Sequence, residues 1–116
     1  MKWKNVTDTF SEGERHYNGK YLEICEVYDE KIEVSLFSAP DGQYEIYFSF
    51  GIFYGIIYVD KEKATALRQE IKAAIIEEYK ANKEPTDGFI DSFAKKYEVC
   101  MPADTIINMN WEDLLF

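Results

Sequence analysis

The chain has 116 residues, of which 47% are hydrophobic, and its formal net charge is −9 at pH 7. A chain of this length buries roughly two-thirds of its unfolded surface, so we expect one domain over residues 1–116 with its own core. Residues 21–60 carry one basic and eight acidic groups. This charge disfavours direct nucleic acid binding, which needs a basic surface opposite the phosphates, and suits a basic partner.

The N-terminal sequence and the cysteines bear on the compartment. No apolar segment follows the two lysines of MKWKNVTDTF, so we expect no secretory signal and a cytoplasmic protein. Cys25 and Cys100 lie far apart and outside any CxxC or Cys/His spacing. We therefore expect two reduced, packed thiols rather than a disulfide or a metal site.

The first predicted strands surround an Asn-Gly turn. Residues 3–10 resemble a strand only weakly. Asn18-Gly19 suits a type I′ turn, after which a strand is expected over residues 20–28. Its apolar residues occupy both faces, and the following DEK does not specify a turn type, so its register stays open.

The stretch SAPDGQ predicts the next turn. Pro40 and Asp41 suit its central positions, and Gly42 suits the left-handed position that closes a three-residue hairpin loop, so Ala39 pairs with Gln43. Counting outward from this turn places four residues of one strand beside four of the next: Ile32, Val34, Leu36 and Ser38 beside Phe50, Phe48, Ile46 and Tyr44.

An uncharged run covers residues 46–59, in a chain whose charged fraction is 30%. Its fourteen residues fall short of the roughly twenty that a helix needs to cross a bilayer, so we expect no membrane contact. Tyr, Phe, Ile and Val dominate the run, which favours strands. Because Gly51-Ile52 suits a type II′ turn, we predict a hairpin of residues 44–50 and 53–59.

Helical periodicity replaces the strand pattern after Asp60. Residues 61–82 repeat apolar side chains at helical spacing, with Leu67, Ile71, Ala74 and Ile75 expected to face inward. A shorter helix is expected over residues 87–97, and an edge strand over 105–109. The fold class is therefore α+β: an antiparallel meander of four to six strands, followed by a long and a short helix packed on the sheet.

The predicted registers gather a different set of side chains on the opposite face of the sheet. It holds three tyrosines, two other large hydrophobic residues and two acids: Glu33, Phe37, Glu45, Tyr47, Tyr54, Ile56 and Tyr58. Tyrosine offers a large rigid contact area with a polar tip and is enriched at interfaces. We predict that these seven residues bind a partner. The alternative is that the second helix or the C-terminal tail covers them and makes a second core.

The residues that usually carry catalysis are sparse. His16 is the single histidine, and its place beside the Asn18-Gly19 turn indicates a solvated loop residue. The stretches DKEKATALRQE and DTIINMNWED are the nearest to a metal loop but lack calcium-loop spacing, and no phosphate-binding glycine motif is present. We expect no enzyme activity, no cofactor and no metal.

Three functions remain open. The first is a protein-binding module for a basic protein; in size, charge and expected architecture the chain is similar to small cytosolic immunity or inhibitor proteins that neutralise basic toxin nucleases, a likeness without a shared motif. The second is a small-ligand domain, with a pocket between the long helix and the sheet lined by Phe48, Phe50 and Phe53. The third is a structural domain that forms a homodimer through the tyrosine face.

Overall fold

The computed structural model describes residues 2–17 and 19–100. Its elements in chain order are β1 (Trp3–Asn5), η1 (Thr7–Thr9), η2 (Gly13–Arg15), β2 (His16–Tyr17), β3 (Lys20–Tyr28), β4 (Ile32–Ser38), β5 (Gln43–Phe50), β6 (Phe53–Asp60), α1 (Lys61–Asn82) and α2 (Asp87–Lys96).

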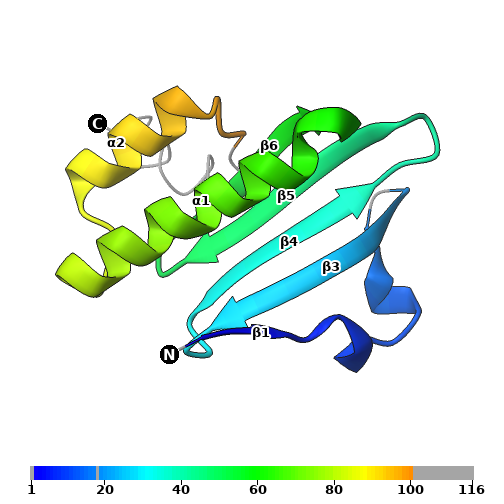
Figure 1. Ribbon diagram of the computed structural model, residues 1–116, viewed down its shortest axis with the longest axis horizontal. Helices are drawn as coiled ribbons and strands as arrows, with labels where there is room; N and C mark the ends of the chain where they lie inside the picture. The colour runs from blue at the N-terminus through cyan, green and yellow to red at the C-terminus, as the bar shows by residue number, and fades with distance from the viewer. Residues whose placement is uncertain (1, 18, 101–116) are drawn as a thin grey trace, which may run out of the picture.

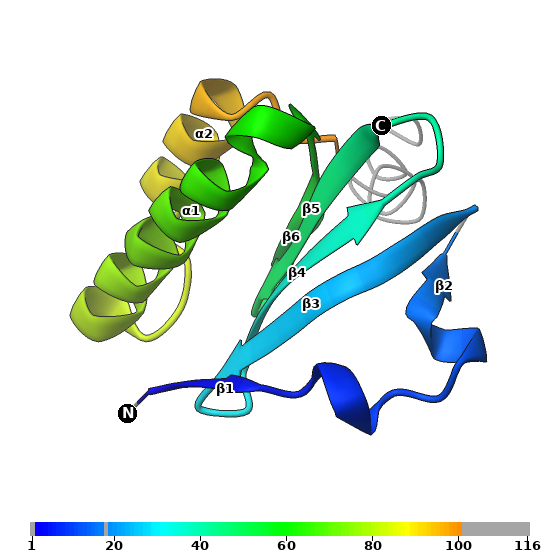
Figure 2. The same cartoon turned by 45° about the vertical axis from the view of Figure 1, so that its right-hand side comes forward.

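The sheet is antiparallel, with the strand order β1-β3-β4-β5-β6, and β2 also pairs with β3. Both α-helices lie on one face of this sheet, as Figure 1 and the turned view in Figure 2 show. We call that side the helix face and the opposite side the second face. The predicted α+β fold, with strands first and helices afterwards, is confirmed.

Two glycine turns set the register of the last three strands. Gly51 adopts a φ of 60° and Gly42 a φ of 85°, in the left-handed region that glycine enters without a steric penalty. Phe50 pairs with Phe53 across the first turn, and the Ala39 amide donates to the Gln43 carbonyl at 2.9 Å across the second. The predicted pairing of β4, β5 and β6 is confirmed residue by residue.

The structure also supplies the register of β3, which the sequence left open. Asp29 and Glu30 both have a positive φ, 55° and 56°, and Tyr28 pairs with Ile32 across this tight turn. The hydroxyl of Tyr79 donates to the Asp29 carboxylate, which ties the turn to α1. Farther from the turn, the pairing of β3 with β4 shifts register between Leu22 and Ile24.

At the N-terminus, the weak strand expected over residues 3–10 is only partly present. The strand stops at Asn5, and the 3₁₀ helix η1 follows. The Asn5 side chain explains the break, because its Oδ1 accepts hydrogen bonds from the amide of Thr7 at 2.9 Å and from its hydroxyl at 2.7 Å. Such local side-chain bonds compete with a strand ladder.

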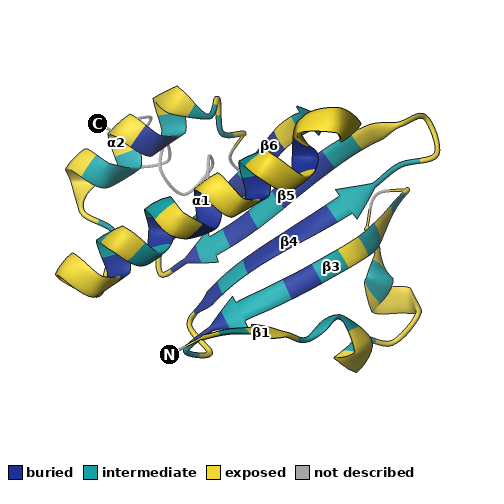
Figure 3. Ribbon diagram, viewed as in Figure 1, coloured by how far each residue is buried: buried dark blue, intermediate teal, exposed yellow. Residues whose placement is uncertain are grey.

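The core lies between the sheet and the two helices (Figure 3). Phe48, Phe53 and Phe93 meet edge to face, with ring centroids 4.9 to 5.6 Å apart, in the geometry that aromatic quadrupoles prefer. Helix α1 begins and ends where predicted, and α2 ends one residue earlier than expected. Ile71 and Ile75 are fully buried, as expected, whereas Leu67 and Ala74 are half-buried.

One part of the helix–sheet interface is ionic, which the apolar pattern of α1 did not predict. Arg68 and Lys72 of α1 are both buried and both form ion pairs with Glu26 of β3, Lys72 at 2.8 Å. The Lys72 ammonium also lies 4.8 Å from the centre of the Trp3 ring. These two ion pairs link α1 directly to β3.

The described chain ends beside the outer edge of the sheet. Cys100 forms an isolated antiparallel bridge with Ile56, with hydrogen bonds of 2.9 and 2.8 Å in the two directions. The strand expected over residues 105–109 lies outside the described residues. Among the described residues, no helix has the length and apolar character needed to span a membrane.

Replacement of Ile71 by Ala tests the packing of α1. We expect the Ile71→Ala variant to lose about 2 to 5 kcal/mol of unfolding free energy, because a buried aliphatic side chain leaves a cavity. Urea unfolding measures the loss. The control is Ile52→Ala, the same change at a turn residue that is 81% exposed, with an expected effect within about 0.5 kcal/mol. Equal midpoints for both variants would contradict this packing.

Gly55 tests the contact between β6 and the end of the described chain. A Cβ at Gly55 would lie 2.6 Å from Val99 Cγ1 and 3.1 Å from the Cys100 carbonyl oxygen. We expect Gly55→Ala to destabilise the fold by about 1 to 3 kcal/mol through overpacking. The control, Gly88→Ala in α2, meets no atom within 4 Å and should be neutral or stabilising by up to about 1 kcal/mol. Thermal unfolding of both variants measures the change in stability. A stabilised Gly55→Ala protein would rule out the close approach of Val99 and Cys100 to Gly55.

Candidate functional site

A hollow of about 550 Å³ opens on the second face of the sheet. Its floor consists of eight side chains from four adjacent strands: Leu22, Glu33, Ser35, Phe37, Glu45, Tyr47, Tyr54 and Ile56. One wall consists of four residues of the N-terminal segment: Phe10, Glu14, His16 and Tyr17. The hollow therefore combines seven aromatic and aliphatic side chains with three glutamates, one histidine and one serine.

Six of the seven predicted partner-binding residues line this hollow; they are Glu33, Phe37, Glu45, Tyr47, Tyr54 and Ile56. Tyr58 does not line it and is 57% exposed on the same face. The expectation that α2 covers this face is wrong, because Phe93 of α2 packs against Phe48 and Phe53 in the core. The expectation that the C-terminal tail covers it concerns residues outside the described ones.

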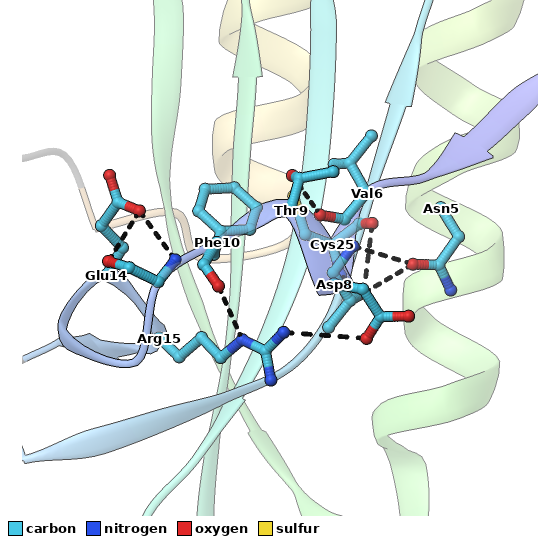
Figure 4. A network of polar contacts seen from close by, with 10 residues as sticks. Asn5, Val6, Asp8, Thr9, Phe10, Glu14, Arg15 and Cys25 are labelled. Atoms are coloured by element: carbon cyan, nitrogen blue, oxygen red, sulfur yellow. Dashed lines mark hydrogen bonds and ion pairs between the residues drawn. The ribbon is translucent and has the colours of Figure 1, made fainter.

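The segment that forms the wall is held by a local network of polar contacts in residues 5–15 (Figure 4). The Arg15 guanidinium donates to the Phe10 carbonyl at 3.2 Å and lies 3.7 Å from the Asp8 carboxylate. Glu14 accepts from the amide of Ser11 at 2.9 Å and from its hydroxyl at 3.0 Å, and these bonds lower the pKa of Glu14. The segment thus keeps its shape mainly through its own contacts.

Backbone and side-chain hydrogen bonds fasten this segment to Cys25 in the middle of β3. The Val6 amide donates to the Cys25 carbonyl at 2.9 Å, and the Cys25 amide donates to the Thr7 hydroxyl at 2.8 Å. β1 and β2 pair with β3 on either side of this point. The edge of β3 is therefore closed, and Phe10 and Tyr17 are placed against the floor.

Glu45 differs from the solvent-facing acid that the sequence suggested. It is only 6% exposed, and the Lys20 ammonium lies 2.6 Å from its Oε1. The same ammonium lies 5.2 Å from the centre of the Tyr58 ring, a distance at which a cation and an aromatic face attract each other. The chain itself thus neutralises Glu45.

Glu33 has no such counter-ion among residues 2–17 and 19–100. Its Oε2 accepts a hydrogen bond of 2.8 Å from the Ser35 hydroxyl, and Ser35 is buried. Burial raises the pKa of the Tyr47 phenol, and the charge of Glu33 raises it further. The floor around Glu33 and Tyr47 is therefore an environment of uncompensated negative charge.

The hollow does not lie where the small-ligand alternative placed a pocket. That alternative expected Phe48, Phe50 and Phe53 to line a pocket between the long helix and the sheet. All three are buried in the packed core, where Phe50 and Phe53 also contact the ring of Phe89. The hollow on the opposite face offers a different place for a small ligand.

The two cysteines are free, but their settings differ. Cys25 is buried as expected, and burial raises the pKa of its thiol, which disfavours the reactive thiolate. Cys100 is exposed rather than packed, so that part of the expectation is wrong. No group of His, Cys, Asp and Glu residues within the described ranges could hold a metal ion.

Sequence reasoning missed the wall residues and Leu22. Phe10, Glu14 and Tyr17 belong to a segment of short 3₁₀ turns, which has no hydrophobic period to detect. His16 was expected in a loop; it is exposed but lies in β2, with its ring 4.9 Å from that of Tyr21. The capping pattern Ser11–Glu14 was the available signal for a turn here.

No protein-family profile matches the chain, and comparisons with curated proteins and with solved structures give no significant match.

The Glu33→Gln variant tests the electrostatics of the floor. Removing the negative charge should make the phenolate of Tyr47 easier to form, so we expect the pKa of Tyr47 to fall toward its ordinary value, while burial keeps it above. NMR titration of labelled tyrosine ring carbons measures this shift. Glu77→Gln, which removes an exposed charge on α1, should leave the titration unchanged. An unchanged pKa of Tyr47 in Glu33→Gln would show that the two groups do not interact.

Proposed function

We propose that this protein is a binding module that takes up a segment of a basic protein in the hollow. The observation that carries the proposal is the hollow itself, in which six predicted binding residues come together. Its floor combines the apolar and aromatic side chains that supply affinity with few polar groups, as binding sites usually do.

Charge supports a basic partner rather than a neutral one. Among the residues that line the hollow, Glu14, Glu33 and Glu45 are acidic, and Lys20 compensates Glu45 from outside it. The chain as a whole is also strongly acidic. Such a surface attracts a basic protein over long range and raises its association rate at low ionic strength.

Exposed tyrosines extend the contact area beyond the hollow. Tyr17 at its wall is 49% exposed, and Tyr58 lies on the same face of the sheet. A stable complex buries about 1,200 to 2,000 Å² in total, more than a hollow alone supplies. The hollow would hold the central anchor residues, and the tyrosines would form part of the surrounding contact.

A more specific form of this proposal is an immunity- or inhibitor-type role in the cytoplasm. The acidity and the small size of the chain support it. A small-ligand role is the second candidate. It is favoured by the volume of the hollow, about 550 Å³, which lies within the range of drug-sized ligand sites of roughly 300 to 1,000 Å³. Homodimer formation through the same face is the third function.

Selection of peptides from a random library tests the basic-partner proposal. We expect bound peptides to be enriched in Lys and Arg and to perturb amide NMR signals of the floor strands. Tyr47→Ala should weaken the selected peptides by about 1 to 4 kcal/mol, as for central aromatic anchors. Ile52→Ala, which removes an exposed side chain away from the hollow, should bind as the original chain does.

Three results would contradict the basic-partner proposal. They are peptides without a basic excess, peptides that bind outside the hollow, and equal binding to a folded Tyr47→Ala protein. Thermal unfolding of each variant separates a binding loss from a folding loss. Binding of neutral small molecules at the floor, with no peptide selected, would support the small-ligand role instead. Sedimentation of the free chain gives its oligomeric state and so tests homodimer formation.

A further inference from the structure

We propose that Glu33 and Tyr47 form a subsite for the cationic end of an arginine or lysine side chain of the partner. This inference rests on the proposed function and narrows it to one position of the floor. It commits the occupant to a guanidinium or ammonium group on an alkyl chain.

The chain itself shows how a cation sits on this face of the sheet. The ammonium of Lys20 binds the Glu45 carboxylate at 2.6 Å and the face of the Tyr58 ring at 5.2 Å, and only 12% of the Lys20 side chain is exposed. Glu45 and Tyr58 are direct partners across β5 and β6. A carboxylate beside a tyrosine on adjacent strands is thus already a cation site in this fold.

Glu33 and Tyr47 repeat this combination one strand away. Ser35 of β4 pairs with Tyr47 of β5, and Glu33 precedes Ser35 by two residues on the same face of β4. The charge of Glu33 is close enough to raise the pKa of the Tyr47 phenol, which is consistent with the two groups facing the same space. Both residues line the hollow.

The two pairs differ in register, because Glu33 is opposite Ser49 and lies diagonally to Tyr47, and they differ in the presence of a cation. Within the described residues, Glu33 accepts hydrogen bonds from the Ser35 hydroxyl, at 2.8 Å on its Oε2, and from the Cys25 thiol, and it forms no ion pair. Glu33 is half-buried, so water solvates its charge less fully than it solvates an exposed carboxylate. A half-buried charge of this kind gains from a counter-ion that also forms hydrogen bonds.

The other acids of the hollow are less suited to this role. Glu45 already holds Lys20, and Glu14 is exposed and accepts two hydrogen bonds from Ser11. The neighbouring Phe37 and Tyr17, whose rings lie 6.1 Å apart, offer apolar surface to the methylene groups of a long side chain. Lysine and arginine bind in this way, with an apolar stem and a charged end.

Titration with blocked amino acids tests the subsite without knowledge of the partner. The probes are the Nα-acetyl methylamides of arginine, lysine and citrulline, citrulline being nearly isosteric with arginine but uncharged. We expect arginine and lysine to shift the amide NMR signals of β4 and β5 around Glu33 and Tyr47, with citrulline at least about tenfold weaker. Bound arginine should also lower the pKa of Tyr47, because a cation offsets the nearby negative charge.

The same titration is repeated with the Glu33→Gln variant. This variant keeps an oxygen that accepts a hydrogen bond from Ser35 but removes the negative charge of the side chain. It should weaken the arginine probe by about tenfold or more and leave the citrulline probe unchanged. Glu77→Gln on the helix layer, which alters net charge equally, should bind as the original chain does. Thermal unfolding confirms that each variant is folded, and the titration of Tyr47 in the original chain needs no variant at all.

The outcomes separate this inference from the proposed function. Equal binding of citrulline and arginine, or an unchanged affinity in folded Glu33→Gln, would overturn the subsite. If the subsite were overturned but selected basic peptides still required Tyr47, the proposed function would stand without the subsite. If the cationic probes bound at Glu33 but no basic peptide did, the subsite would stand and the protein-binding function would fail.

Discussion

The pairing register of β4, β5 and β6 is the constraint on which the rest of the structure depends. Side chains alternate between the faces of a sheet, so a slip by one residue would exchange the two faces completely. Here the turns at Gly42 and Gly51 agree on one register. That register sends Phe48, Phe50 and Phe53 under the helices and leaves the seven predicted binding residues on the second face.

The second face is hollow because a local segment borders it, while both α-helices pack elsewhere. The N-terminal segment bonds to β3 at Cys25 and keeps its shape mainly through bonds of its own side chains. A wall of this kind stands at one side of the floor instead of lying across it. The polar floor residues satisfy one another in part: Lys20 with Glu45, and Ser35 with Glu33.

Much of this arrangement could be predicted from the sequence. The parts that could not be predicted have physical causes. Glycine turns and two clear periods were enough to place β3 to β6, both α-helices and six lining residues. The turn at Asp29 and Glu30 was not predictable, because both residues adopt a left-handed conformation that glycine or asparagine usually takes. The wall was not predictable either, because 3₁₀ turns fixed by side-chain bonds carry no period. Nor does a sequence show that Lys20, twenty-five positions from Glu45, lies beside it.

The ion group of Glu26, Arg68 and Lys72 has a consequence for how uniquely the helix layer is placed. Apolar side chains recur every three or four residues along α1, so sliding this helix by one turn would still offer apolar surface to the sheet. Glu26 distinguishes the two placements. A shift in one direction would leave only Arg68 opposite it, with Ala64 in the other place, and a shift in the other direction would leave only Lys72, with Ile76. Glu26 is half-buried and both of its cationic partners are buried, so the loss of an ion pair here is costly, and this group favours one helix position over its neighbours.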